Sequence, residues 1–424
     1  MSALHAVFRG LLICVLAVFV TWSGLLGQSW PQFGGTNRNF KVDVKGLASS
    51  WPASGPKQLW SRELGDGYSS IVVDGGTLYT MYRPLGVMSL YTKAEEVVAA
   101  IDNTTGKTYW EHRFEAPFLK SMQMENGPGP HSTPLLTADR LFAVGVTGKF
   151  YCLDKKTGKV IWFHDLYQEY KAPSRGRGYS CSPIAYKNLV ILTVGGPGQA
   201  LMAFNQKDGS VVWKKQEFDN SPSSPILINV DGQDQLVAFL GSAIAGVDPG
   251  NGELLWQHPH RTDWGLNISL PVWGENNLLF MTSAYSGGSR LIQLNRVNGK
   301  TTPKELWFSN RMRVHIGNTI RVGDTIYGSS GDFGPAFLSA IDVKTGTVLW
   351  QDRSFSKANL LYADGKFIIL DEDGNLALAT ASPQGLKVLS RVELLKKKAW
   401  TAPTLVGTRL FIRDQKTLMA LDLG

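Results

Sequence analysis

Short apolar runs alternate with turn residues along the chain after residue 29, and this pattern predicts β-strands rather than helices. One phrase recurs: an apolar residue, an Asp or Asn, a polar turn closed by Gly, and a strand that carries a Trp. Clear copies span residues 100–110, 152–162 and 341–350. The Asp or Asn side chain can accept hydrogen bonds from backbone N–H groups of the turn, and Gly adopts its positive φ. Each copy is therefore predicted to form a β-hairpin.

A second phrase precedes each hairpin, and it begins with a small or polar residue. Two or three apolar residues follow, then a turn and a returning apolar strand, as in residues 69–79, 132–136 and 182–184. The two phrases together make eight units of about 49 residues, each with four strands. Four-stranded antiparallel units with this period are typical of a β-propeller. We expect no long helix after residue 29.

The two ends of the repeat indicate how the ring closes. The last unit supplies only three strands, up to Leu421, while an additional strand at residues 58–64 precedes the first complete unit. Pairing these two parts would leave no open end. The predicted fold is therefore all-β: an eight-bladed β-propeller of four-stranded antiparallel blades, closed by pairing an N-terminal strand with the C-terminal blade. Residues 30–424 would form this single domain, with residues 30–56 as a lead-in segment across one face.

A Trp at one fixed place in each repeat predicts a structural role, because a large ring would fill the same gap between neighbouring blades. These predicted blade-docking residues are Trp60, Trp110, Trp162, Trp213, Trp256, Trp307 and Trp350.

Residues 1–29 have the pattern of a secretory signal peptide. They contain one Arg and no acidic residue, with an apolar run over residues 11–20 and small residues after it. The run is about half as long as a bilayer span requires. We predict cleavage near Trp30 and export to the periplasm or the medium, with no integral membrane domain in the mature chain. An uncleaved N-terminal anchor is the alternative. Cys14 lacks the small preceding residue of a lipid-attachment site.

Charge and cysteine content exclude several classes of protein. The chain has 43 Lys and Arg against 35 Asp and Glu, and its longest basic run is residues 396–398, so the sequence does not predict nucleic-acid binding. Cys152 and Cys181 are too few for a disulfide framework, a cysteine-rich zinc site or a haem attachment. They form either one disulfide or two buried thiols. We expect a monomer.

The hairpin phrase at Asp102, Asp154 and Asp342, with Thr-Gly and then Trp, resembles the tryptophan-docking repeat of pyrroloquinoline quinone (PQQ)-like propellers. Residues 30–38 also resemble the lead-in of exported bacterial PQQ-binding-like repeat proteins. The superfamily includes quinoprotein alcohol dehydrogenases and the outer membrane protein assembly factor BamB. The resemblance covers the mature chain and implies the fold, while one fold hosts many functions.

The chain departs from both branches of this superfamily. The dehydrogenases typically have adjacent cysteines and a calcium site made by Glu, Asn and Asp, and neither feature is assignable here. Residues 371–374 are acidic, but their spacing fits a hairpin turn better than a calcium loop. The chain is also short for the loops that build a quinone site. BamB matches the length, but its lipid-attachment motif is missing here.

In a propeller, residues just before each innermost strand lie closest to the central channel. Candidate channel residues at these places and in nearby loops are Tyr68, His131, Arg175, Arg177, Tyr179, Arg311, Arg313, His315, Lys398 and Trp400. Such a basic and aromatic set suits an anionic ligand. Alternatively, these residues bond strand ends and line a water-filled channel. We assign no catalytic residue and no metal site, and we interpret His258, His260 and Asp263 as a surface loop.

The sequence leaves three functional hypotheses. The first is a non-enzymatic binding or scaffold protein of the cell envelope, with an envelope protein partner and no confidently assigned cofactor. The alternative is a PQQ-dependent dehydrogenase with a divergent site, in which PQQ with calcium would be the cofactor. The third is a propeller that binds or acts on glycans.

Overall fold

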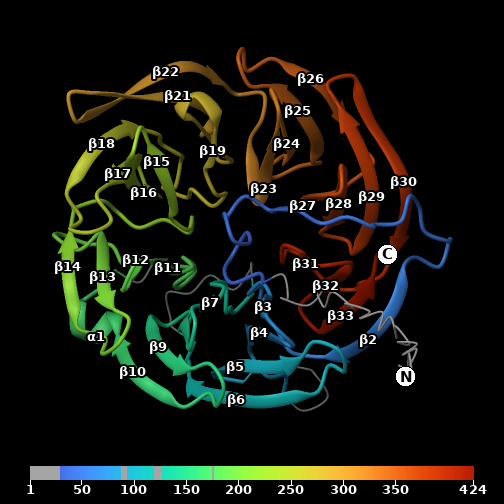
Figure 1. Ribbon diagram of the computed structural model, residues 1–424, viewed down its shortest axis with the longest axis horizontal. Helices are drawn as coiled ribbons and strands as arrows, with labels where there is room; N and C mark the ends of the chain where they lie inside the picture. Colours follow the sequence, from blue (N-terminus) through green and yellow to red (C-terminus); the bar gives the residue numbers. More distant parts are fainter. Residues whose placement is uncertain (1–28, 87–92, 119–126, 174–175) are drawn as a thin grey trace, which may run out of the picture.

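The structure is a computed structural model that describes residues 29–86, 93–118, 127–173 and 176–424. Residues 1–28 of the predicted signal peptide and the candidate residue Arg175 lie outside the described residues. The described strands form eight sheets arranged around a central axis, as Figure 1 shows. The predicted eight-bladed propeller is confirmed, and each blade has its four strands in antiparallel order.

The first four blades follow chain order from the inside outwards. The first and second blades contain β3 (Val72–Asp74), β4 (Thr77–Tyr82), β5 (Glu95–Asp102) and β6 (Thr108–Glu115), and then β7 (Leu135–Leu136), β8 (Arg140–Val144), β9 (Lys149–Asp154) and β10 (Val160–Asp165). The third blade contains β11 (Ile184–Tyr186), β12 (Leu189–Thr193), β13 (Leu201–Asn205) and β14 (Val211–Lys215). The fourth blade contains β15 (Ile226–Val230), β16 (Gln233–Phe239), β17 (Ala243–Val247) and β18 (Leu254–Pro259).

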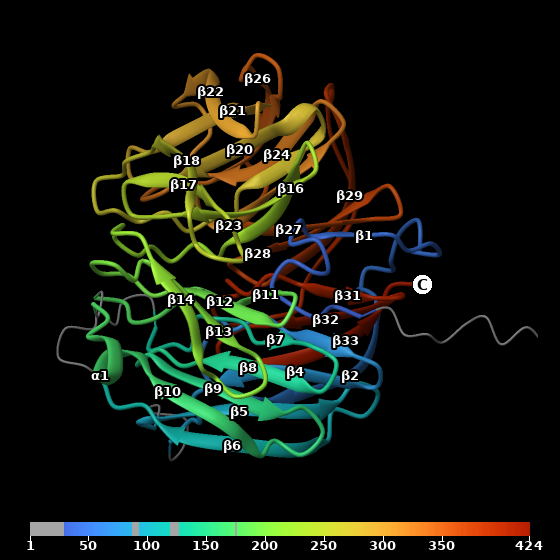
Figure 2. The ribbon, with the colours of Figure 1, turned by 60° about the vertical axis from the view of Figure 1, so that its left-hand side comes forward.

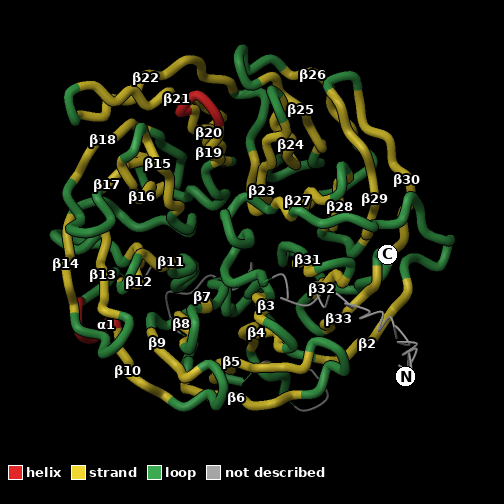
Figure 3. The backbone as a smooth tube through the Cα atoms, viewed as in Figure 1, coloured by secondary structure: helices red, strands yellow, loops and turns green. Residues whose placement is uncertain are grey.

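The next three blades have the same order. The fifth blade contains β19 (Val272–Gly274), β20 (Leu278–Ser283), β21 (Gly288–Val297) and β22 (Lys300–Ser309). The sixth blade contains β23 (Val314–Val322), β24 (Thr325–Ser330), β25 (Phe337–Asp342) and β26 (Val348–Asp352). The seventh blade contains β27 (Ala358–Ala363), β28 (Lys366–Asp371), β29 (Asn375–Ser382) and β30 (Gly385–Glu393). Helix is confined, within the described residues, to α1 (Leu166–Tyr170) and the short 3-10 turn η3 (Glu275–Asn277), as Figure 3 shows.

The eighth blade closes the ring as the sequence predicts. It combines β31 (Thr404–Val406), β32 (Arg409–Arg413) and β33 (Thr417–Asp422) with β2 (Lys57–Glu63) from the start of the chain. Strand β2 is antiparallel to β33, with Trp60 opposite Ala420. Both ends of the repeat are thus held in one sheet, so unfolding either end opens the ring.

The Trp residues tie the outer strand of one blade to the hairpin turn of the next. Trp110 donates a hydrogen bond from Nε1 to the Lys155 carbonyl oxygen, 3.2 Å away. Its ring covers Gly158, where an added Cβ would lie 2.5 Å from Cε3 of the ring. This contact explains why the turn ends in Gly, which also has φ +70°. Trp60, Trp162, Trp213 and Trp307 repeat the arrangement on Gly106, Gly209, Gly252 and Gly346.

Two predicted docking residues use other contacts. Trp350 donates to the Ser382 carbonyl oxygen of the seventh blade at 2.8 Å. Trp256 donates to Oε1 of Gln235 in its own blade at 2.6 Å, and Gln235 donates to Thr301 of the next blade at 2.8 Å. The connection from Trp256 to the next blade is therefore indirect, and nothing lies within 4 Å of a Cβ added at Gly299 in the corresponding turn of the fifth blade.

A second set of hydrogen bonds joins the blades close to the channel. The backbone N–H of Ser70 donates to the Thr133 hydroxyl at 3.0 Å, and the N–H of Thr133 donates to the Ser182 hydroxyl at 2.9 Å. Ser182 and Ser224 continue the pattern at 2.9 Å. These are the small polar residues that begin the second sequence phrase. They join each of the first blades to the next, and Asn318 and Asn359 do so in later blades.

Candidate functional site

The lead-in segment (residues 30–56) crosses one face of the propeller: it starts beside the first blade, passes the centre of the ring and continues over the seventh blade to β2, as Figures 1 and 2 show. Trp30 forms a β-bridge with Val73 of the first blade. Further along, β1 (Lys41–Val42) adds to β27 of the seventh blade as a parallel strand. The lead-in segment therefore spans the mouth of the channel on this face, which we name the closed end.

Arg38 fixes the lead-in segment to two more blades. Arg38 is 3% exposed, and its guanidinium donates to the carbonyl oxygens of Pro183, in the third blade, and Pro225, in the fourth, the latter at 2.8 Å. Its Nε donates to Oε1 of Gln32 at 3.0 Å. Burial lowers the pKa of Arg38 to about 10, so the side chain remains charged at neutral pH. These bonds satisfy a charge that would otherwise be costly to bury.

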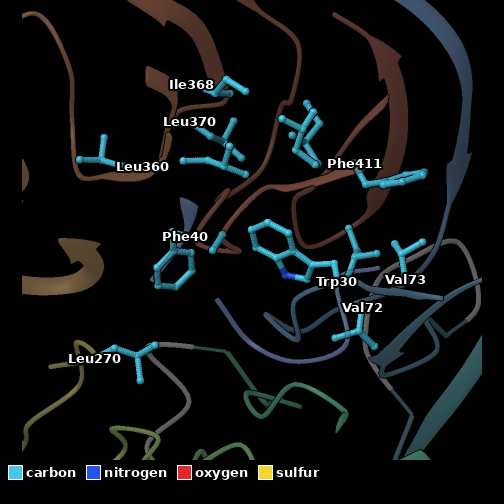
Figure 4. Close-up of a cluster of buried hydrophobic side chains, with 14 of the residues drawn as sticks. Trp30, Phe40, Val72, Val73, Leu270, Leu360, Ile368, Leu370 and Phe411 are labelled. Atoms are coloured by element: carbon cyan, nitrogen blue, oxygen red, sulfur yellow. The ribbon is translucent and has the colours of Figure 1, made fainter. Parts of the chain in front are cut away.

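The backbone of the lead-in segment is strained where it enters the channel. Arg38 has φ +49° and Phe40 has φ +56°, a region that costs most side chains about 1–3 kcal/mol. The hydrogen bonds of Arg38 and the burial of Phe40 offset this cost. Phe40 belongs to the same apolar cluster as Leu270 and Leu360, as Figure 4 shows.

A cavity of about 150 Å³ lies above this closed end, at the centre of the ring. Phe33 and Phe40 of the lead-in segment are among its lining residues, with ring centroids 5.3 Å apart in an edge-to-face arrangement. The remaining wall alternates small polar and apolar side chains from several blades: Ser70, Ser182, Ser224, Ile268, Ser269, Leu270, Ile316 and Asn318.

Residues that precede the innermost strands surround the opposite mouth, which we name the open end. Tyr68 stacks on His131 with ring centroids 6.0 Å apart and contacts Trp400 at 5.1 Å. All three residues line the cavity. They come from the first, second and eighth blades, so the ring of blades gathers aromatic side chains that are far apart in the sequence.

Two histidines at the open end are neutral at physiological pH. Burial lowers the pKa of His131 to about 4, assisted by the positive charges of Arg83 and Arg177. Burial also lowers the pKa of His315 to about 4, with further contributions from Lys357 and Arg177. Because Arg177 acts on both rings, it places positive charge at the mouth of the cavity that it lines.

Glu372 is a carboxylate at the open end that already has hydrogen-bond donors. Glu372 accepts hydrogen bonds from Nε1 of Trp400 at 2.8 Å and Nζ of Lys398 at 3.0 Å. Burial alone would raise the pKa of Glu372, but these two donors and the charges of Lys398 and Lys357 outweigh it and lower the pKa. Glu372 is thus an ionised, paired group rather than a proton donor.

A groove of about 490 Å³ adjoins the cavity and shares Arg177, Ser180 and Pro222 with it. Trp264 and Phe333 line this groove, although they are 54% and 76% exposed. Their ring centroids lie 5.7 Å apart in an edge-to-face arrangement, and Tyr285 contacts both rings. We refer to Trp264, Tyr285 and Phe333 as the aromatic cluster.

The structure brings together half of the sequence-predicted channel residues. Those that line the cavity are Tyr68, His131, Arg177, His315 and Trp400. Lys398 pairs with Glu372, and Arg313 lies 3.7 Å from the carboxylate of Asp332. Arg311 is exposed, while Tyr179 is buried, donates to the Thr193 carbonyl oxygen and lines the groove instead of the cavity.

Sequence reasoning missed Phe33, Phe40 and the aromatic cluster. Phe33 and Phe40 belong to the lead-in segment, outside the repeat. Tyr285 lies between the second and third strands of its blade, and Phe333 lies in the corresponding loop of the next blade. Residues just before each innermost strand were the ones predicted to line the channel, so these loops were not included. The Trp-Pro-Gln-Phe-Gly-Gly opening was the available signal for the lead-in segment.

The described residues contain no group of three His, Cys, Asp or Glu side chains placed to hold a metal ion. The predicted surface loop is wrong for the two histidines: His258 lies in β18 and contacts Glu305 at 3.2 Å, and His260 is buried. Asp263 is exposed, as predicted, and accepts a hydrogen bond from Ser286. Asp371 accepts hydrogen bonds from the backbone N–H groups of Asp373 and Asn375, which is the expected hairpin turn. Cys152 and Cys181 are buried free thiols.

These residues do not fit PQQ with calcium. PQQ has three fused rings and three carboxylates, whereas a 150 Å³ cavity has the size of one that holds a single benzene. Glu372, the carboxylate nearest to Trp400, already has two donors and is not joined by a second acidic ligand in the described part of the site. We therefore derive no reaction step through this cofactor. No helix in the described part of the chain has the length and apolar character of a membrane span.

Comparison with solved structures supports the fold. BamB from Moraxella catarrhalis matches with a TM-score of 0.59 and 16% identity, over 87% of this chain and 98% of that chain. Quinohemoprotein alcohol dehydrogenase from Comamonas testosteroni matches with a TM-score of 0.51 and 13% identity, over 94% and 81%. At these identities the similarity concerns the propeller alone.

Sequence comparison identifies the family. BamB from Yersinia pestis is 21% identical over 325 residues, which cover 72% of this chain and 77% of that protein. The quinoprotein alcohol dehydrogenase PedH from Pseudomonas putida is 24% identical over 273 residues, but they cover only 40% of that enzyme. The family model described as outer membrane protein assembly factor BamB matches residues 94–352. This match spans more than half of the chain, which therefore belongs to the BamB family.

Proposed function

We propose that this chain is a non-enzymatic binding protein of the cell envelope that holds a protein partner at the open end of its propeller. Family membership supports the envelope role, because several relatives bear the name outer membrane protein assembly factor. The proposed process is therefore the assembly of outer membrane proteins. Export to the periplasm, expected from residues 1–29, belongs to the same proposal.

The aromatic cluster is the observation that carries the docking site. Phe333 and Trp264 are large apolar side chains that remain mostly exposed while contacting each other beside a groove. Aromatic residues next to a concave surface are typical anchors of protein interfaces, where their burial supplies much of the binding energy. Arg313 and the exposed Arg311 come from the loop between the fifth and sixth blades. A partner segment with apolar side chains flanked by acidic residues fits this surface.

A matched set of variants tests the proposal. The tagged chain is expressed in its native envelope, crosslinked and purified, and its partners are identified by mass spectrometry. We expect outer membrane assembly proteins to co-purify with the unchanged chain and to be lost from the double variant Trp264→Ser, Phe333→Ser. Val297→Ser is the control, because Val297 is also exposed, at 65%, but lies at the far end of β21.

Two results would contradict the proposal. One is recovery of the same partners with the double variant, and the other is the absence of a reproducible envelope partner for the unchanged chain. Binding to glycans that is lost in the double variant would instead assign the aromatic cluster to the glycan hypothesis.

A further inference from the structure

The central cavity has the size and shape of a site for one small group. Its volume is about 150 Å³, close to that of cavities known to accept a single benzene ring. The lead-in segment lines it with Phe33 and Phe40 on the side of the closed end, so the open end is the entry that we assign to a ligand. A channel running through the propeller is thereby converted into a blind pocket.

The inner part of this pocket favours an apolar ring. Phe33, Phe40, Leu270 and Ile316 contribute apolar surface there. Water bound next to such surface makes few hydrogen bonds, so its displacement by an apolar group is favourable. The two Phe rings meet edge to face, an arrangement that a third aromatic ring can extend.

The outer part of the pocket favours a negative charge. Arg177 lines the cavity and acts on both His131 and His315 through its positive charge. Lys357 adds to this effect on His315, while Asp332 and Glu372 oppose it. Glu372 is paired with Lys398 and Trp400, and Asp332 faces Arg313. Because Arg177 lines the cavity, an incoming anion meets its positive charge at the edge of a region of low dielectric, where a charge-assisted contact is strong.

His315 supplies a second group for such an anion. The side chain is 9% exposed, and its Nε2 is hydrogen-bonded to the Tyr285 hydroxyl. We assign the tautomer in which the Tyr285 hydroxyl donates to Nε2, which leaves the proton of the neutral ring on Nδ1. That Nδ1 is buried without a hydrogen-bond partner among the described residues. An unpaired buried donor is costly, and a carboxylate oxygen would satisfy it.

We propose that this pocket binds one aromatic ring that carries a carboxylate, with the ring on Phe33 and Phe40 and the carboxylate toward Arg177 and His315. Two sources share this chemistry: a free aromatic acid, and the terminal residue of a polypeptide that ends in an aromatic side chain. The second source would deepen the proposed function, because such a terminus could belong to the protein partner. The first is independent of that function.

Binding of phenylacetate to the full mature chain tests the site. We expect phenylacetate to raise the melting temperature and to alter the fluorescence of Trp400, and we expect the uncharged phenylacetamide to bind about tenfold more weakly. A peptide ending in Phe is then compared with the same peptide amidated at its C-terminus. Tighter binding of the acid peptide than of phenylacetate indicates a polypeptide terminus, and the reverse indicates a free acid.

Variants link the result to the named residues. Arg177→Gln should remove the preference for acid over amide, while Arg177→Lys should restore part of it. His315→Phe should weaken phenylacetate binding with little effect on phenylacetamide. Arg353→Gln is the matched control, because this exposed arginine lines neither the cavity nor the groove.

Failure of this site and failure of the proposed function are distinguishable. The double variant Trp264→Ser, Phe333→Ser should keep the preference for phenylacetate over phenylacetamide, because neither residue lines the cavity and Arg177 is unchanged. The inference is overturned if phenylacetate does not bind, if acid and amide bind equally, or if Arg177→Gln keeps the preference. Calcium-dependent binding of PQQ would likewise overturn the assignment of a single-ring site.

Discussion

The closed and open ends of the channel use the same kinds of residue in opposite ways. At the closed end, Arg38 is buried and donates to two blades, and Phe40 is 1% exposed. At the open end, Arg177 faces a cavity and Phe333 is 76% exposed. The closed end buries its Arg and Phe in contacts that stabilise the fold, whereas at the open end Arg177 lines a cavity and Phe333 is exposed beside a groove.

The difference arises from segments outside the repeat. The repeat builds the ring, because Trp residues tie the blades on the outside and hydroxyl groups tie them near the channel. The lead-in segment then covers one mouth, and the loops that hold Trp264 and Phe333 shape the other. Function in this propeller is therefore expected where the chain departs from its repeat.

The largest expected effect concerns the anchor of the closed end. Arg38→Met removes the donors to the carbonyl oxygens of Pro183 and Pro225, and both acceptors then lie buried near an apolar side chain. Loss of two such charged hydrogen bonds should lower the free energy of unfolding by about 3 kcal/mol or more. Chemical denaturation measures this change.

The control for Arg38 is Lys45→Met, in the same lead-in segment. Lys45 is 84% exposed and lies 3.8 Å from Asp364. Its loss should change the free energy of unfolding by less than about 0.5 kcal/mol. Equal effects of the two substitutions would show that the lead-in segment is not anchored by Arg38.

The contacts between Trp rings and the turn glycines of the next blade provide a second test, because two glycines have similar backbone conformations but only one is covered by a ring. Gly158 has φ +70° and Gly299 has φ +80°, so alanine is strained at both. At Gly158 the new Cβ would also lie 2.5 Å from the Trp110 ring, whereas nothing lies within 4 Å at Gly299. Gly158→Ala should therefore cost about 1–3 kcal/mol more than Gly299→Ala in equilibrium unfolding. Equal costs would mean that the ring contact contributes nothing.

A third prediction concerns pH. Burial lowers the pKa of His260 to about 3, below its ordinary value of 6.5. The unfolded chain therefore takes up a proton at His260 before the native chain does, and native stability falls as pH decreases from about 6.5 toward 3. His260→Phe removes this contribution, so its melting temperature should fall less over that range than that of the unchanged chain. At pH 7 the variant should be at least as stable, because both ring nitrogens of His260 are buried without a partner among the described residues. A steeper fall in the variant would contradict this account.

The smallest expected change in stability is at the open end. Phe333→Ser should alter the free energy of unfolding by less than about 0.5 kcal/mol, because the side chain is already mostly exposed. The same substitution should weaken partner binding. A large loss of stability in thermal unfolding would mean that Phe333 is part of the folded core.

The repeat made the fold predictable, because the same turn and Trp recur often enough to reveal blade number and closure. It also located Tyr68, His131 and Trp400, since each precedes an innermost strand. Phe40 and Phe333 were not predictable, because their surroundings depend on contacts between segments with no repeated sequence. Trp256 occupies the repeat position but bonds Gln235, because the next blade has a different turn. Contacts with a neighbouring blade depend on both sequences.

Site-specific photocrosslinking tests the contrast between the two ends most directly. A benzophenone amino acid is placed at position 333 at the open end or at the exposed position 37 at the closed end, and the chain is irradiated in its native envelope. We expect a reproducible protein adduct from position 333 that is lost with Trp264→Ser, and none from position 37. An adduct from position 37 alone would contradict the account, because it would place the partner over the lead-in segment.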